Sequence, residues 1–215
     1  MGDLTSLWVA RRCGFLLLVP LLLVAPSAFG ESLSGHDLLA ALRTGGYVIL
    51  MRHASSPRTP PEPARANADN LQHERQLDEA GRSSAHAMGE ALRRLQIPIG
   101  LVLSSPAYRA LETVRLAQLG PVRTFVQLGD AGQSMQADTS GARAVWLKAQ
   151  VGQAPVSGRN TIIVTHLPNI MEAYPQGTAE LADGEALILH PDGRGGASIV
   201  ARVKIDEWAH LQVMP

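Results

Sequence analysis

An arginine and a histidine directly follow an apolar run, and the side chains of this pair could bind an anion or take part in catalysis. The run covers residues 47–51, and Arg52 and His53 come next. Such a run is typical of a strand buried on both faces of a parallel sheet. Ligands bind at the carboxyl ends of such strands, and a guanidinium beside an imidazole suits an anion such as phosphate. Taken alone, the pair could equally follow a core strand without any function.

Polar side chains recur at the ends of the later predicted strands. Strands are expected at 97–103, 123–128 and 160–165. Ser104-Ser105 follow the first of these, Asp130 follows the second, and the third ends in Thr165-His166. Arg109 lies one turn into the helix that follows 97–103. Because the carboxyl ends of parallel strands lie along one edge of a sheet, we expect these side chains to converge.

Two histidines, at least two arginines and one carboxylate are sufficient for phosphoryl transfer. A neutral imidazole attacks phosphorus, cations stabilise the phosphoryl oxygens, and a carboxylic acid protonates the leaving oxygen. This chemistry requires neither a metal nor a cofactor. The seven histidines have no metal-ligand spacing within a predicted helix, so no metal site is expected.

Predicted helices alternate with these strands. Apolar residues at helical spacing and capping residues indicate helices over 34–43, 78–95, 106–118 and 138–150. A turn at Pro191–Gly196 separates two further strands, 185–190 and 197–204. The alternation predicts an α/β fold, a three-layer α/β/α sandwich with a mostly parallel central sheet. The pattern does not give the strand order.

The stretch 54–76 between the first strand and the second helix is rich in proline and carries Arg58 and Arg65. A connection of this length is uncommon inside a compact domain unless it is functional, for example as a lid. We expect it to set the choice of substrate, with either arginine able to fold over an anion. The alternative is a solvated connector.

The N-terminus resembles a secretory signal peptide over residues 1–30. Two arginines precede an apolar run over 14–25, and Ala28 and Gly30 give an A-x-A-like end. The alternative is a retained membrane anchor, although the run is shorter than the ~20 residues that a spanning helix needs. We therefore expect cleavage after Gly30, no stable membrane insertion, and a periplasmic or secreted domain over 31–215.

The composition of residues 31–215 excludes several classes of function. Without the leader the chain has 17 basic and 18 acidic residues, a balance that gives no electrostatic footprint for nucleic acid. The only cysteine, Cys13, lies in the leader, so neither a disulfide nor thiol chemistry is expected in the domain. The oligomeric state is not predicted.

Three motifs in order resemble the histidine phosphatase (phosphoglycerate mutase-like) superfamily. Arg52-His53-Ala54 resembles its Arg-His-Gly signature, Ser104–Thr113 resembles the Ser-Ser-Pro turn that precedes its second phosphate-binding arginine, and Val164-Thr165-His166 resembles the strand end with its second histidine. Leu77–Arg82 matches the helix start between the first two motifs. The resemblance spans roughly residues 46 to 190.

The resemblance implies an exported, metal-independent phosphomonoesterase that acts on a small phosphorylated substrate. His53 would be the nucleophile that becomes phosphohistidine, and Arg52, Arg109 and His166 would complete the phosphate pocket. The acid of the family often follows the next strand as Leu-x-Glu, and Leu128-Gly129-Asp130 has this spacing. Asp130 is therefore the expected acid, with Glu185 and a carboxylate near residue 138 as rivals.

The sequence departs from the family pattern after His53. Ala54 replaces the usual glycine, and Ser56 and Arg58 stand where an acidic-and-threonine pattern is usual. Ser56 and Arg58 are expected to be additional phosphate donors, or otherwise ordinary loop residues. If the acid were lost, the alternative function would be a non-catalytic protein that binds a phosphoryl ligand on the same fold. Of the remaining histidines, only His73 in the long loop is a candidate for the pocket.

Overall fold

A mixed six-stranded sheet forms the centre of the computed structural model, which describes residues 32–130 and 141–211. The strand order is β3-β2-β4-β1-β5-β6. The first four strands of this order run parallel, and β5 and β6 are antiparallel to their neighbours. The predicted fold, with a mostly parallel central sheet, is confirmed. The strands are β1 (Val48–Arg52), β2 (Ile99–Ser104), β3 (Val122–Thr124), β4 (Asn160–Thr165), β5 (Ala186–Pro191) and β6 (Ala197–Val203).

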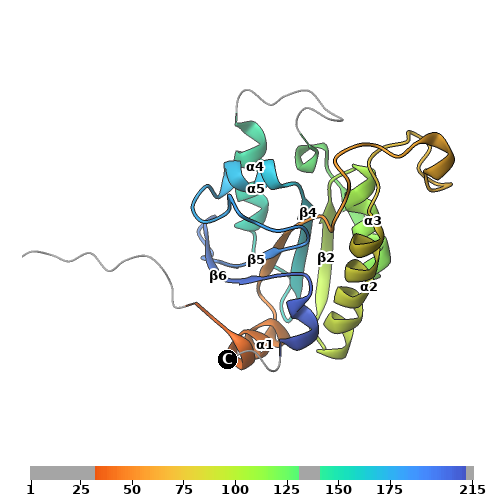
Figure 1. Cartoon of the computed structure of the whole chain (residues 1–215). Helices are drawn as coiled ribbons and strands as arrows, with labels where there is room; N and C mark the ends of the chain where they lie inside the picture. Colours follow the sequence, from red (N-terminus) through yellow and green to blue (C-terminus); the bar gives the residue numbers. More distant parts are fainter. Residues whose placement is uncertain (1–31, 131–140, 212–215) are drawn as a thin grey trace, which may run out of the picture.

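Helices cover both faces of this sheet (Figure 1). Successive residues of β1 enter two different cores, Ile49 and Met51 on one face and Val48 and Leu50 on the other, as the two-residue repeat of a strand requires. The first core packs against α1, α2 and α3, and the second against α4 and α5. The predicted three-layer sandwich is therefore confirmed. The helices are α1 (Gly35–Thr44), α2 (Glu79–Arg94), α3 (Tyr108–Ala117), α4 (Ala142–Val151) and α5 (Leu167–Ala173).

Two elements differ from the prediction. The strand expected over 123–128 ends at Thr124, and a 3₁₀ turn, η2 (Val126–Leu128), follows it. The turn buries Leu128, whose carbonyl accepts a hydrogen bond from Thr165 Oγ1 at 2.8 Å. In addition, α5 follows His166 directly. Proline fits its first turn, because an N–H group there would have no acceptor within the helix. This short helix was not predicted.

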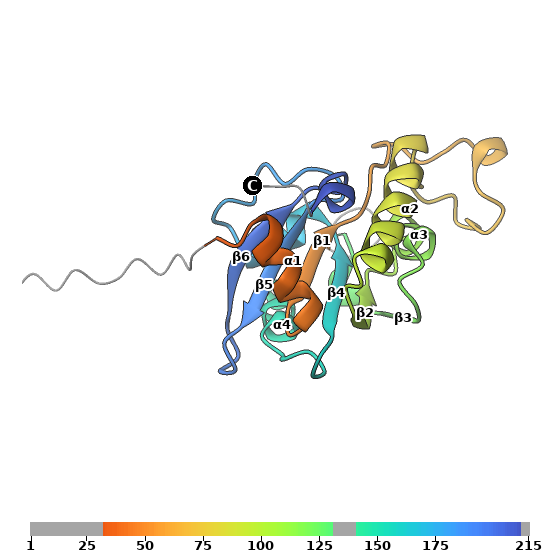
Figure 2. The ribbon, with the colours of Figure 1, turned by 90° about the horizontal axis from the view of Figure 1, so that it is seen from below.

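The long connection between β1 and α2 contains only one short 3₁₀ turn, η1 (Pro63–Arg65), and it extends outward beyond α2 and α3 (Figure 2). Buried Glu112 of α3 holds this connection in place through hydrogen bonds. Its carboxylate accepts hydrogen bonds from Leu77 N at 2.8 Å and from Asn67 Nδ2 at 3.0 Å. Because a buried carboxylate is costly unless hydrogen-bonded, these contacts hold the loop on the helix that also carries Arg109.

None of the helices within residues 32–130 and 141–211 has the length and apolar character needed to cross a membrane. The predicted signal peptide, residues 1–30, lies outside the described residues.

We predict that Gly89→Ala in α2 lowers the free energy of unfolding by about 1–3 kcal/mol, because α2 and α3 pack too closely for an added methyl group. A Cβ at this position would lie 1.9 Å from the carbonyl oxygen of Ala117, a backbone atom that cannot move independently. Urea denaturation measures the effect. The neighbouring exposed substitution Glu90→Ala is the control, and equal stability of the two variants would contradict the packing argument.

Candidate active site

The guanidinium of Arg109 lies at the centre of the predicted constellation, in the first turn of α3, with only 2% of the residue exposed. Its Nε donates to His53 Nε2 at 3.2 Å. Its Nη2 donates to Asp130 Oδ2 at 2.6 Å and lies 3.0 Å from His166 Nδ1. Side chains that follow β1, β4 and η2 therefore meet on one arginine, as expected from the convergence of strand ends.

His53 presents an unprotonated nitrogen to this cluster. Its Nδ1 lies 2.7 Å from the carbonyl oxygen of Ala54, which can only accept, so Nδ1 carries the proton and Nε2 the lone pair. Burial lowers the pKa of His53 to about 3; the hydrogen bond to Ala54 opposes this shift, and the charges of Arg109 and Arg52 add to it. A neutral imidazole with a lone pair on Nε2 is the form that a nucleophile requires.

His166 has the opposite tautomer. Arginine has no acceptor atom, so the Nδ1 of His166 accepts from Arg109 and its Nε2 carries the proton, which it donates to Ser105 Oγ at 2.8 Å. Burial, and then the charge of Arg109, lowers the pKa of His166 well below its ordinary value. Ser105 belongs to the Ser-Ser-Pro turn after β2, so this turn orients the second histidine.

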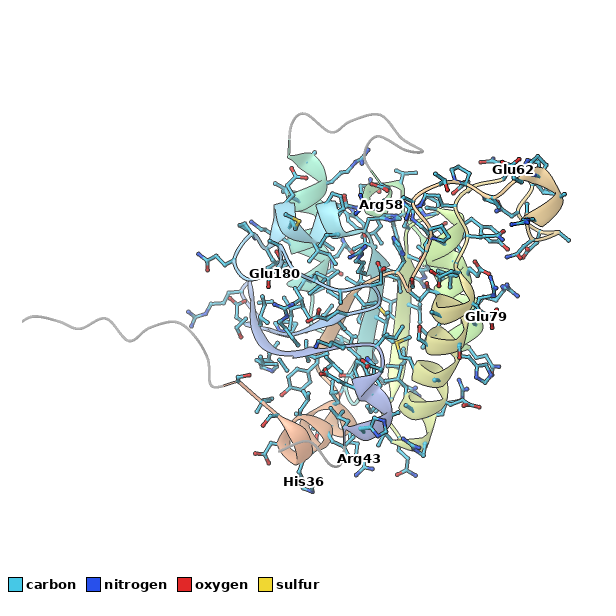
Figure 3. All side chains as sticks on the ribbon, viewed as in Figure 1. His36, Arg43, Arg58, Glu62, Glu79 and Glu180 are labelled. Carbon is cyan, nitrogen blue, oxygen red and sulfur yellow. The ribbon has the colours of Figure 1, made fainter. Side chains whose placement is uncertain are left out.

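A pocket of about 490 Å³ lies over these groups. It holds every predicted site residue except Arg109, which lies behind it in contact with three members of the site. Figure 3 shows Arg58 at this end of the molecule and His36 at the opposite end. The lining residues are Arg52, His53, Ser56, Arg58, Arg75, Asp130, His166, Leu167, Pro168 and Asp183.

The guanidinium of Arg52 contacts the backbone and a carboxylate through its two Nη atoms, and its Nε–H is left without an acceptor in the described part of the chain. Its Nη1 donates to the carbonyl of Leu181 at 2.9 Å, and its Nη2 lies 2.5 Å from Asp183 Oδ1. Its Nε is buried and has no hydrogen-bond partner among the described residues. Since an unsatisfied buried donor is unfavourable, an oxyanion in the pocket would improve the environment of this group.

Two charged residues of the pocket, Arg75 and Asp183, were not predicted from the sequence. Arg75 lies at the end of the long loop and donates to the carbonyls of Pro57 and Ser56 at 2.6 and 3.2 Å. Arg75 stands two positions before the Leu77–Arg82 motif, and this position was a signal in the sequence that could have placed it near the site. Arg65 does not line the pocket. Nothing in the sequence around Asp183 distinguishes it from an ordinary turn residue.

The other candidates lie elsewhere. The carboxylate of Glu185 accepts hydrogen bonds from Ala182 N at 2.8 Å and Arg202 Nε at 2.7 Å and does not line the pocket, so it is in no position to act as the acid. The rival near residue 138 lies outside the described residues. His73 is exposed and does not line the pocket. Ala54 has no positive φ, so its backbone does not need the glycine of the family.

Within residues 32–130 and 141–211, no group of three or more histidine, cysteine, aspartate or glutamate side chains is arranged to hold a metal ion.

We predict that the neutral state of His53 makes the fold sensitive to acid. Because its folded pKa of about 3 lies below the ordinary 6.5, the unfolded chain binds the proton more readily between these values, and stability falls as the pH falls through this window. His53→Gln, which is polar but does not titrate, should reduce this loss by up to about 1.4 kcal/mol per pH unit. Urea denaturation at pH 6.5 and 4.5 measures it. Exposed His36→Gln is the control, and an unchanged pH slope in His53→Gln would contradict the assignment.

Comparison with known proteins supports the family that the motifs indicated. No curated protein sequence matches the chain. Among solved structures, the protein histidine phosphatase SixA in complex with tungstate is similar, with a TM-score of 0.55 and 17% identity over 75% of this chain and 98% of that one. SixA from Agrobacterium tumefaciens gives a TM-score of 0.50 and 16% identity over 74% and 97% of the two chains. These likenesses concern the fold. Residues 48–129, which include Arg52, His53 and Arg109, match the model of the histidine phosphatase superfamily (branch 1). This match covers 82 of the 215 residues, and it supports the superfamily that the three motifs indicated.

Proposed function

We propose that this protein hydrolyses a phosphate monoester of a small molecule through a phosphohistidine intermediate on His53, without a metal ion. The match to the superfamily model supports a phosphatase. The observation that carries the finer proposal is the state of His53, a buried neutral imidazole whose Nε2 lone pair meets Arg109 in an arginine-rich pocket. This arrangement combines a nucleophile with the charges that its transition state needs.

The phosphoryl group would bind among the arginines. Three arginines, Arg52, Arg58 and Arg75, line the pocket, and Arg109 lies behind it. The pocket has only two carboxylates, Asp130 and Asp183, so an excess of positive charge is left for an oxyanion. Arg52 Nε supplies a buried donor that has no other partner among the described residues. The structure of SixA with tungstate supports this reading, because tungstate is a tetrahedral oxyanion like phosphate.

The reaction would proceed in two displacements. First, His53 Nε2 forms a bond to phosphorus while the bond from phosphorus to the ester oxygen breaks, and Asp130 protonates the departing oxygen. A phosphoryl group that takes over Arg109 would release both Asp130 and the Nε2 lone pair of His53, and the singly protonated phosphate ester would supply the proton that Asp130 passes to the departing oxygen. Second, Asp130 accepts a proton from a water molecule that attacks phosphorus, the P–N bond breaks, and His53 is restored together with inorganic phosphate. Arg109 and His166 would stabilise the charge that develops on the phosphoryl oxygens.

We also propose export, with residues 1–30 as a signal peptide and residues 31–215 acting in the periplasm or outside the cell. This proposal rests on the apolar run and its flanking residues in the sequence. Amino-terminal sequencing of the protein recovered from outside the cytoplasm tests it, with Glu31 expected as the first residue.

We predict that the protein hydrolyses an aryl phosphate in the presence of a chelator, and that His53→Ala lowers kcat by about 10³-fold or more because the nucleophile is lost. His166→Ala should cost about 10²–10³-fold, as expected for one stabilising group. Steady-state kinetics measure both, with exposed His36→Ala as the control. Turnover at the wild-type rate in His53→Ala would contradict the mechanism, and phosphate binding without turnover in the wild type would favour the alternative of a binding protein.

We predict that Asp130→Asn impairs the hydrolysis of alkyl phosphates by about 10²-fold or more, since an alkoxide leaves poorly without a proton. Aryl phosphates with an acidic phenol should be affected much less, because their leaving group needs little protonation. The ratio of kcat/KM values for the two substrate classes measures the effect, and Asp37→Asn on α1 is the control. Equal losses for both classes would mean that Asp130 is not the acid.

A further inference from the structure

We propose that Asp183 limits the affinity of the pocket for phosphoryl groups, because it pairs with Arg52 and an incoming phosphoryl group competes with it for this arginine. The limit would apply to the substrate and to the product, inorganic phosphate. This inference rests on the proposed function, because it assigns Asp183 a role in the same pocket. The juxtaposition that carries it is a carboxylate oxygen 2.5 Å from Nη2 of the arginine that follows β1.

Asp183 belongs to a turn that is held in place from several sides. The turn closes through a hydrogen bond from Glu185 N to the carbonyl of Ala182 at 3.1 Å, and Gly184 has a φ of +73° that favours glycine. Gly184 N also donates to the carbonyl of His53 at 2.9 Å. The backbone around Asp183 is therefore fixed to the end of β1, so the carboxylate is presented to Arg52 by the fold rather than by a freely moving loop.

The two carboxylates of the pocket differ in position. Asp130 pairs with the buried Arg109, and 13% of its side chain is exposed. Asp183 pairs with Arg52, and the exposed fractions of the two side chains are 36% and 23%. Asp183 thus lies at the more accessible part of the pocket and does not touch either histidine ring within the described contacts. This position suits control of binding rather than proton transfer.

Electrostatics sets the direction of the effect. A phosphoryl dianion that enters this pocket meets the negative charge of Asp183 beside the arginine that it must contact, and like charges repel strongly where water is partly excluded. Loss of this charge should strengthen phosphate binding. Arg52 would keep its hydrogen bond to the carbonyl of Leu181, and an asparagine at position 183 would keep a side-chain oxygen beside Arg52 Nη2.

The test compares the binding of inorganic phosphate to the full chain by isothermal titration calorimetry at neutral pH. We expect Asp183→Asn to bind phosphate on the order of tenfold more tightly than the wild type, with screening by solvent limiting the gain. Asp183→Ala should bind more weakly than Asp183→Asn, because it also removes the side-chain oxygen that lies against Arg52 Nη2. Asp37→Asn, an equal change of net charge on α1 at the far end of the molecule, should leave the affinity unchanged.

Inhibition kinetics supply a second readout. Inorganic phosphate should inhibit Asp183→Asn at correspondingly lower concentration, and KM for the aryl phosphate should fall. A gain in affinity cannot result from a poorly folded variant. Suppose that the wild type binds phosphate and turns over substrate. If Asp183→Asn then binds phosphate no more tightly than the wild type and its KM is not lower, the role of Asp183 alone is overturned. A wild type that neither binds phosphate nor turns over would overturn the proposed function and this inference with it.

Discussion

Arg109 buries a permanent charge where two histidines and one carboxylate meet. Removing a guanidinium from water is costly unless its donors find acceptors, and here Nε and Nη2 reach His53, His166 and Asp130 at 2.6–3.2 Å. A protonated imidazole cannot accept a hydrogen bond on the nitrogen that carries the added proton. The buried arginine therefore requires both histidines to be neutral, which agrees with the lowered pKa of each. The need of buried Arg109 for hydrogen-bond acceptors is thus what keeps a lone pair on Nε2 of His53.

The surrounding fold fixes Arg109 from several directions. Thr113, one turn further along α3, accepts a hydrogen bond from Ala54 N at 3.1 Å and so links the helix to the residue after His53. Ser105 of the preceding turn orients His166. Glu112 of the same helix holds the long loop through Leu77 N, and this loop brings Arg75 to the pocket. A single helix thus positions the central cation, the loop and the two histidines relative to one another.

The sequence was sufficient for the parts of this account that depend on periodicity and strand ends. Buried strands followed by Arg52-His53, Ser104-Ser105 and Thr165-His166 predicted the layers of the fold and several residues of the site. The contacts between distant turns were not predictable, because no local pattern encodes them. Asp183 pairs with Arg52 across 131 positions of the chain, and Arg75 is brought to the pocket only by the path of the long loop. The strand predicted over 123–128 was too long: β3 ends at Thr124, and the turn η2, which buries Leu128, takes its place.

The most direct test of the central claim is detection of the covalent intermediate. The full chain is mixed rapidly with an aryl phosphate, quenched in alkaline denaturant because a phosphorus–nitrogen bond to histidine is labile to acid, and digested for peptide mass analysis. The account predicts a transient phosphate adduct on His53 that forms and decays at rates consistent with turnover. Turnover without an adduct on His53, or an adduct on another residue that forms as fast as turnover, would contradict it.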